Sequence, residues 1–192
     1  MQKALIQTKA NALFSRISFV KTSVADIAKA CGLGKGTIYL YFKSKDEIVH
    51  AIIEERIARI VEADAAFFGD PALPLEAKVS HFFEGAVDES FALKELIFGA
   101  FENVQGRMFT DVFLKYGRYF EWGVDRFANL VRAYPPYADR PADELREDAR
   151  TLIELVVGRM VLFLMARDWN DKEGLKAIVG PLSLRLFRSI IG

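Results

Sequence analysis

Apolar residues recur at the spacing of an α-helix along almost the whole chain. The first run places its apolar side chains on one face of a helix that ends before Thr22. Its members are Ile6, Ala10, Leu13, Phe14 and Ile17. No segment shows the strict alternation of apolar and polar residues that is typical of a half-buried strand. The pattern therefore predicts an all-α fold of about nine helices.

Capping residues, glycines and prolines indicate where the helices begin and end. Two short helices are expected within residues 23–42, and Ser44 with Glu47 forms a capping box that begins a long helix ending near Phe68. A linker follows, made of Gly69, Asp70, Pro71 and Pro74. Later apolar stripes predict helices over 75–86, 97–108, 109–131, 143–169 and 175–190, the third ended by Pro135 and Pro136 and the last kinked or divided by Pro181.

Residues 23–42 have the pattern of a helix, a glycine turn and a second helix. Ser23 and Asp26 form a capping box, and Gly32 ends the first helix because glycine readily adopts the left-handed conformation. In the second helix, the helical period directs Ile38 and Phe42 toward a core. The residues directed away from that core are Gly36, Thr37, Tyr39 and Leu40. This outward face is the candidate surface for reading DNA.

The distribution of charge favours a polyanionic partner for the same end of the chain. The formal net charge is zero, but residues 1–50 carry eight Lys or Arg and only three acidic residues. This segment therefore has a charge of +5, and the remainder has −5. A basic segment on an acidic body is expected when only one end of a protein meets phosphate groups. A purely structural helical hairpin would explain neither the spacing nor the charge.

The residue types of the second helix suit contact with the major groove. Lys35 brings a cation to the first turn, Gly36 allows close approach of the backbone, and Leu40 can touch a thymine methyl group. The hydroxyl groups of Thr37 and of two tyrosines can bond bases or phosphates. The predicted DNA-binding residues, including Thr22 and Lys45 as clamps on the DNA backbone, are Thr22, Ser23, Lys35, Gly36, Thr37, Tyr39, Leu40, Tyr41 and Lys45. Because this helix has no Arg, Asn or Gln, selectivity is expected to depend on apolar contact and DNA shape.

Residues 4–60 resemble the N-terminal domain of TetR-type transcriptional regulators. The matching motifs are Thr22-Ser23-Val24, Asp26-Ile27-Ala28, Gly36-Thr37-Ile38-Tyr39, Tyr41-Phe42 and Ser44-Lys45-Asp46-Glu47. The resemblance implies a homodimer that binds a near-palindromic operator in double-stranded DNA and usually acts as a repressor. One departure is Gly34, where the family often has Ser, so a hydroxyl cap or a phosphate contact is missing there.

The resemblance also implies a helix-turn-helix DNA-binding domain, residues 1–45, and a C-terminal ligand-binding and dimerisation domain, residues 46–192, connected by a helix over 46–68. The last two long helices would pair with those of a partner, because a monomer would leave much of the apolar run 152–164 uncovered. Gly158 lowers helix stability by roughly 1 kcal/mol relative to Ala, which a closely approaching partner would explain. The expected dimerisation residues are Leu152, Val156, Met160, Phe163, Leu182 and Leu186.

Aromatic residues are dense between residues 75 and 131. They indicate either ordinary core packing or, as the resemblance implies, a pocket for a small apolar or aromatic effector. The predicted pocket residues are Phe82, Phe98, Phe101, Phe113, Tyr116, Phe120 and Met160. Effector binding would then move the helix 46–68 and change the separation of two reading helices. The alternative is a DNA-bound adaptor that contacts a protein partner and has no small-molecule effector.

Other classes of function have no support in the sequence. It contains no nucleophile–base pattern, phosphate loop or dinucleotide fingerprint, so neither an enzyme nor a cofactor is expected. His50, His81 and Cys31 lack the spacing of metal ligands. The stretch 152–166 is too short, and too interrupted by charge, to span a membrane. The single cysteine and the N-terminal sequence lead us to expect a cytoplasmic protein.

Overall fold

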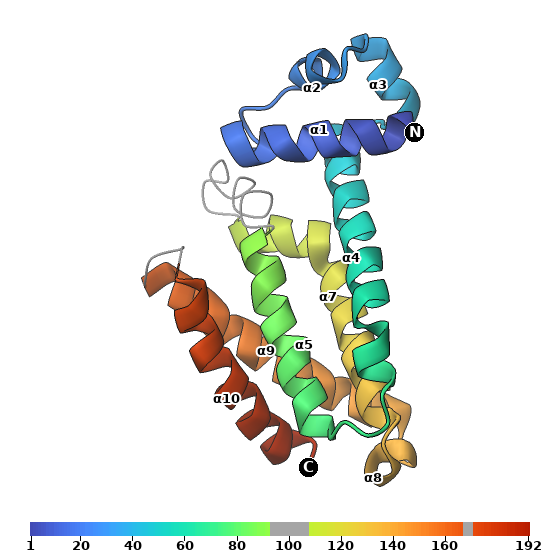
Figure 1. The fold of residues 1–192 in the computed structure, drawn as a ribbon. Coiled ribbons are helices and arrows are strands. Elements are labelled where there is room, and N and C mark those ends of the chain that lie inside the picture. Colours follow the sequence, from blue (N-terminus) through green and yellow to red (C-terminus); the bar gives the residue numbers. More distant parts are fainter. Residues whose placement is uncertain (93–107, 167–170) are drawn as a thin grey trace. The chain divides into compact units, whose positions relative to one another are not determined.

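The computed structural model describes residues 1–92, 108–166 and 171–192, and the side chains of these residues except at 108–116 and 164–166. All regular structure in these residues is helical, which confirms the predicted all-α class (Figure 1). The chain forms two compact units. The described part of the first contains Met1–Ala65 and residues 108–112, and that of the second contains Ala66–Ala92 and residues 113–166 and 171–192.

The first unit holds α1 (Gln2–Ile17), α2 (Val24–Cys31), α3 (Lys35–Tyr41) and most of α4 (Lys45–Gly69). α2 and α3 lie on the same side of α1 (Figure 1). One face of each helix is buried, as the apolar spacing predicts. The most deeply buried apolar residues of this unit are Ile6, Ala10, Phe14, Ile27, Ile38, Phe42, Ile48 and Val49.

A polar residue joins α1 to α4 inside the first unit. The side-chain amide of Gln7, which is buried, donates to the carbonyl oxygen of Ala51 (2.9 Å) and to Glu55 Oε2 (3.2 Å). A buried amide is stable only when it is hydrogen-bonded, so Gln7 fixes how these two helices pack. Helical periodicity marks apolar positions, and it therefore could not identify this residue.

The start of α4 differs in one detail from the predicted capping box. The hydroxyl oxygen of Ser44 accepts a hydrogen bond from the Glu47 N–H (3.1 Å), as expected. The Glu47 carboxylate, however, accepts from the N–H of Lys43 (2.5 Å). In a complete capping box the donor would be the N–H of Ser44, so this bond is shifted by one residue. The side chain of Glu47 therefore also holds the segment that joins α3 to α4.

The second unit contains the end of α4, α5 (Leu75–Ala92), most of α7 (Met108–Arg132), α8 (Pro135–Ala138), α9 (Ala142–Ala166) and α10 (Lys172–Ile190). α5 and α10 pack against each other, and a Cβ atom at buried Gly180 would lie 3.4 Å from Glu84 Oε1. Ion pairs from Asp88 to Lys172 (2.8 Å) and Lys176 (2.7 Å) join the same two helices.

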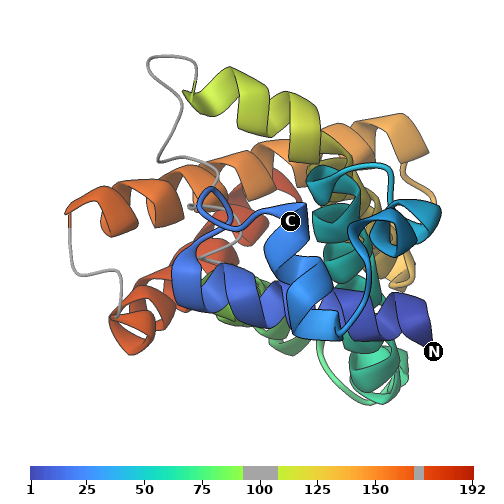
Figure 2. The same cartoon turned by 90° about the horizontal axis from the view of Figure 1, so that it is seen from above.

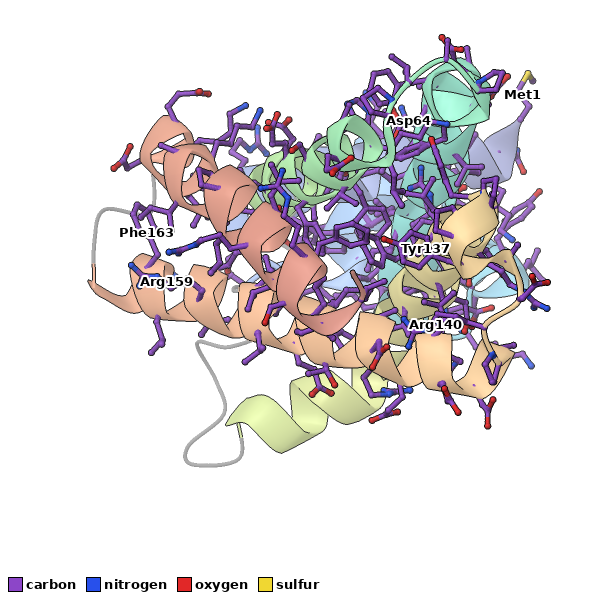
Figure 3. All side chains as sticks on the ribbon, turned by 90° about the horizontal axis from the view of Figure 1, so that it is seen from below. Met1, Asp64, Tyr137, Arg140, Arg159 and Phe163 are labelled. Carbon is purple, nitrogen blue, oxygen red and sulfur yellow. The ribbon has the colours of Figure 1, made fainter. Side chains whose placement is uncertain are left out.

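The segment before α9 is tied to the C-terminal end of the chain. Figure 3 shows Arg140 near the start of α9 and Arg159 and Phe163 toward its other end. The guanidinium of Arg140 pairs with Asp148 (2.5 Å) and donates to the carbonyl oxygen of Ile191 (3.2 Å). These bonds fix the first turns of α9 against the end of α10.

The prolines behave partly as predicted. α7 ends at Arg132, before Pro135 and Pro136, but Pro135 also begins the short helix α8, which the apolar pattern did not indicate. Proline suits the first position of a helix because the amide there has no partner in the helix. Pro181 lies inside α10 without dividing it.

The helix predicted over 97–108 falls almost entirely on residues outside the described part of the chain, as does Trp169.

Candidate nucleic-acid interface

The helix-turn-helix predicted over residues 23–42 is formed by α2 and α3 (Figure 2). The Ser23 hydroxyl accepts from the Asp26 N–H (3.2 Å), and the Asp26 carboxylate accepts from the Ser23 N–H (2.8 Å), so the predicted capping box is complete. The bonds from the Ser23 hydroxyl and amide lower the pKa of Asp26. Gly32 ends α2 with φ at 67°, in the left-handed region that favours glycine.

α3 divides into a buried face and an exposed face. Ile38 and Phe42 are buried in the core of the first unit, as predicted. Lys35, Gly36 and Tyr39 are exposed, Leu40 is 82% exposed, and Thr37 is half-buried. The Lys35 ammonium lies 5.9 Å from the centre of the Tyr39 ring. The exposed face therefore presents a cation, an aromatic hydroxyl and a large apolar side chain on one short helix.

Gly36 is not required by the packing of the first unit. A Cβ atom at this position would have no neighbour within 4 Å, and the residue lies inside a helix. Glycine lowers helix stability by about 1 kcal/mol relative to alanine in a helix interior. The position is therefore open to close approach by another molecule.

Thr22, which the sequence predicts as a clamp on the DNA backbone, is buried. Its side chain is 1% exposed, and its hydroxyl donates to the carbonyl oxygen of Ser18 (2.7 Å). The hydroxyl group is therefore used within the fold, and a contact between Thr22 and DNA stays a prediction. Thr22 closes the turn between α1 and α2.

Lys45 is also bound to the same turn. Its ammonium group donates to the carbonyl oxygens of Phe19 (2.5 Å) and Thr22 (2.8 Å), and it lies 4.1 Å from the centre of the Phe19 ring. These carbonyl groups hold the ammonium inward, so in this structure Lys45 positions the start of α2. Sequence reasoning could not find this contact, because it joins residues that are more than twenty positions apart.

Tyr41 has a second role in the geometry of α3. Its hydroxyl donates to Gln2 Oε1 (2.5 Å) and so ties the end of α3 to the start of α1. Ser23 likewise serves as the cap of α2. The predicted DNA-binding residues that are exposed on α3 are therefore Lys35, Gly36, Tyr39, Leu40 and Tyr41, with half-buried Thr37 beside them.

The predicted effector residues are described only in part. Phe98 and Phe101, and the side chains of Phe113 and Tyr116, lie outside the described residues. The Phe82 ring packs on those of Phe83 (5.3 Å) and Phe127 (5.0 Å) in the second unit. Phe120 is half-buried and Met160 is buried. The pocket itself stays a prediction.

The predicted dimerisation stripe on α9 is covered within the second unit. Leu152, Val156, Met160 and Phe163 are all buried in the single chain, so the exposed part of the run 152–164 is formed by other residues. Apolar positions that remain exposed on α9 are Leu155 (50%), Val157 (38%) and Leu162 (60%). On α10, Leu182 and Leu186 are half-exposed.

The described residues offer no metal site and no membrane-spanning helix. No group of three or more His, Cys, Asp or Glu residues within them could hold a metal ion. None of the helices described is long and apolar enough to cross a membrane.

Comparison with known proteins assigns the helix-turn-helix to a family. Residues 6–52 match the family described as bacterial regulatory proteins, tetR family. The HTH-type transcriptional regulator AcrR of Shigella flexneri is 37% identical over 92 residues, which are 45% of this chain and 43% of that protein. The matched region thus spans less than half the length of this relative. The N-terminal segment of the chain is thus similar to the DNA-binding domain of this family.

Solved structures share the fold of the whole chain at low sequence identity. The fatty acid degradation regulator FadR from Bacillus halodurans has a TM-score of 0.64 and 21% identity, with 96% of this chain and 94% of that chain covered. The transcriptional regulator FadR from Bacillus subtilis in complex with stearoyl-CoA has a TM-score of 0.61 and 18% identity, with 98% and 99% covered. These similarities extend the fold assignment to the C-terminal helices.

Proposed function

We propose that this protein is a DNA-binding transcription regulator that reads duplex DNA through the exposed face of α3. The observation that carries the proposal is this exposed face, which lies within the segment that matches the tetR family. It presents Lys35, Tyr39 and Leu40 beside a glycine with open space around it. The net charge of +5 over residues 1–50 supplies the attraction to phosphate that non-specific DNA binding needs.

We also propose that the protein binds a near-palindromic operator as a homodimer. The support is an exposed apolar face on α9, formed by Leu155 and Leu162 around Gly158, where a Cβ atom would have no neighbour within 4 Å. Half-exposed Leu182 and Leu186 on α10 extend the apolar surface. A second copy of α9 and α10 would bury these residues in a four-helix bundle. Gly158 would allow the two α9 helices to cross closely.

The regulation we propose is repression that a small apolar or aromatic effector relieves. A solved relative of the same fold holds stearoyl-CoA, a ligand with a long apolar chain. Aromatic rings such as Phe82 and Phe127 are abundant in the second unit, and α4 runs from the first unit into the second. An effector acts only through its different affinities for the DNA-binding and the released states. The second candidate function is a DNA-bound adaptor that contacts a protein partner. It would bind DNA in the same way but would not respond to a small effector.

A selection from random duplex DNA at fixed salt tests the central proposal. We expect the wild-type protein to enrich a palindrome, and Lys35→Ala and Tyr39→Ala to bind it at least tenfold more weakly, because each removes a group from the exposed face of α3. Arg132→Ala, an exposed cation of the second unit, is the matched control and should bind normally. No enriched sequence, or undiminished binding by both α3 variants, would exclude the proposal.

The same binding assay separates the two kinds of regulation. Acyl-CoA thioesters and free aromatic acids are added in turn to the protein–operator complex. Release by any of them supports the effector. Unchanged affinity with every one, together with binding of a protein partner to the operator complex, would favour the adaptor.

A further inference from the structure

The exposed face of α3 carries one large apolar side chain that its own fold does not use. Leu40 is 82% exposed, whereas Ile38 and Phe42 of the opposite face are buried. Removing apolar surface from water is favourable, at about 25 cal/mol per Å². Leu40 is therefore the position on α3 that gains most from apolar contact with a partner.

The composition of α3 limits what such a contact can be. The segment Lys35–Tyr41 contains no Arg, Asn or Gln, the residues that form bidentate bonds with guanine or adenine. Base edges in the major groove present one prominent apolar group, the C5 methyl of thymine. An exposed leucine on a helix in that groove therefore matches thymine better than any other base.

The geometry of α3 also explains how a short side chain could reach a base. Gly36 and Leu40 are four residues apart, so they lie on the same side of the helix. Because Gly36 has no side chain and open space where a Cβ would be, the helix can approach the DNA closely at this point. A methyl group at position 36 would hold the helix, and with it Leu40, farther from the bases.

We propose that Leu40 is a specificity-determining residue that reads a thymine methyl group in each half of the operator, with Gly36 permitting the approach. The proposal rests on the proposed function, because it concerns the sequence preference of the same DNA-reading surface. It names the chemical feature of the operator that the protein selects.

Replacement of thymine by deoxyuridine in the selected operator tests this assignment. Deoxyuridine keeps every hydrogen-bonding group of thymine and lacks only the methyl group. At one position in each half-site, we expect the wild-type protein to lose about fourfold in affinity when one half-site is changed, and about sixteenfold when both are. Leu40→Ala should bind the thymine and deoxyuridine operators equally.

Two further variants serve as controls for this experiment. Leu5→Ala removes another partly exposed leucine of the first unit, and it should keep the full preference for thymine. Gly36→Ala should reduce the preference although Leu40 is present. The urea midpoint of Leu40→Ala should equal that of the wild type, because the side chain is outside the core.

The outcomes distinguish this inference from the proposed function. If the wild-type protein selects no operator, both are overturned. If it selects an operator but shows no preference for thymine at any position, or if Leu40→Ala keeps the preference or binds DNA as tightly as wild type, only the role of Leu40 is overturned.

Discussion

At the scale of single residues, three glycines around the turn between α2 and α3 have different physical roles. Gly32 has a positive φ that only glycine adopts without strain. Gly34 is the N-cap of α3 and makes no side-chain capping bond, and a Cβ there would lie 3.8 Å from Thr37 Oγ1, an ordinary contact. Gly36 has open space around it. The first glycine is required by the backbone, and the last is explained best by a partner.

Gly36→Ala should therefore separate stability from function. Alanine favours the helix, so we expect the free energy of unfolding to rise by up to about 1 kcal/mol. The added methyl group obstructs close approach to DNA, so the affinity for the operator should fall at least tenfold. Urea denaturation and operator binding at fixed salt measure the two quantities.

Gly32→Ala is the matched comparison for this prediction. Its positive φ makes alanine unfavourable, so this variant should lower the free energy of unfolding by about 1 kcal/mol. If Gly36→Ala also destabilised the protein, or left the operator affinity unchanged, position 36 would not be a site of close approach.

At the scale of helices, ion pairs orient α7 against α9 in the second unit. Glu121 of α7 accepts from Arg146 (2.5 Å) and Arg150 (2.7 Å) of α9, and Arg146 also pairs with Asp125 (2.6 Å). Hydrogen bonds from Arg150, and then from Arg146, lower the pKa of Glu121 from 4.5 to about 2. Because Glu121 is 38% exposed, water and salt screen part of this interaction.

This lowered pKa predicts a pH dependence of stability. A carboxylate whose pKa is lower in the folded state stabilises the protein above pH 4.5, and the contribution is lost as the pH falls from 4.5 to about 2. Glu121→Gln should therefore lose less stability than the wild type over this interval. Thermal unfolding at several pH values measures the difference.

Salt and a second variant control for general acid effects. Added salt should reduce the difference between Glu121→Gln and the wild type, because the pair is partly exposed. Glu62→Gln, an exposed glutamate of α4, should follow the wild-type curve. Identical pH profiles for the wild type and Glu121→Gln would show that the network adds nothing to stability.

The proposed reading of an operator requires two copies of the chain. A single α3 without Arg, Asn or Gln makes few base-specific hydrogen bonds, so the fixed separation of two such helices has to supply much of the selectivity. The exposed leucines of α9 are the part of the second unit that suits this pairing. Dimerisation and operator binding are therefore expected to fail together.

Leu162→Glu should uncouple the dimer. The leucine is 60% exposed in the single chain, so folding should be retained, while a buried carboxylate would weaken the seam between copies. We expect a monomer by sedimentation and at least a tenfold loss of operator affinity. Ala142→Glu, exposed at the other end of α9, should remain dimeric. If the Leu162→Glu protein remained a dimer, the dimer interface would not include this face of α9.

Several features follow from the sequence alone, because they depend on neighbouring residues. The helical period, the capping box of Ser23 and Asp26, the glycine turn and the division of α3 into two faces are all properties of residues a few positions apart. Local hydrogen bonds and the alternation of apolar residues determine them. The motif match to the tetR family rests on the same short segment.

The roles of residues that meet across the chain depend on how the helices pack. The sequence predicted that Lys45 and Thr22 contact the DNA backbone. In the structure, carbonyl groups of the turn before α2 bind the Lys45 ammonium, and Thr22 is buried in the same turn. The apolar stripe of α9 looked like a dimer surface, but its neighbours in the second unit cover Leu152 and Val156 and leave Leu155 and Leu162 exposed. Periodicity shows that a face is apolar, and only packing shows which neighbour covers it. The position of α3 could therefore be predicted from sequence, whereas the residues that remain exposed to a partner could not.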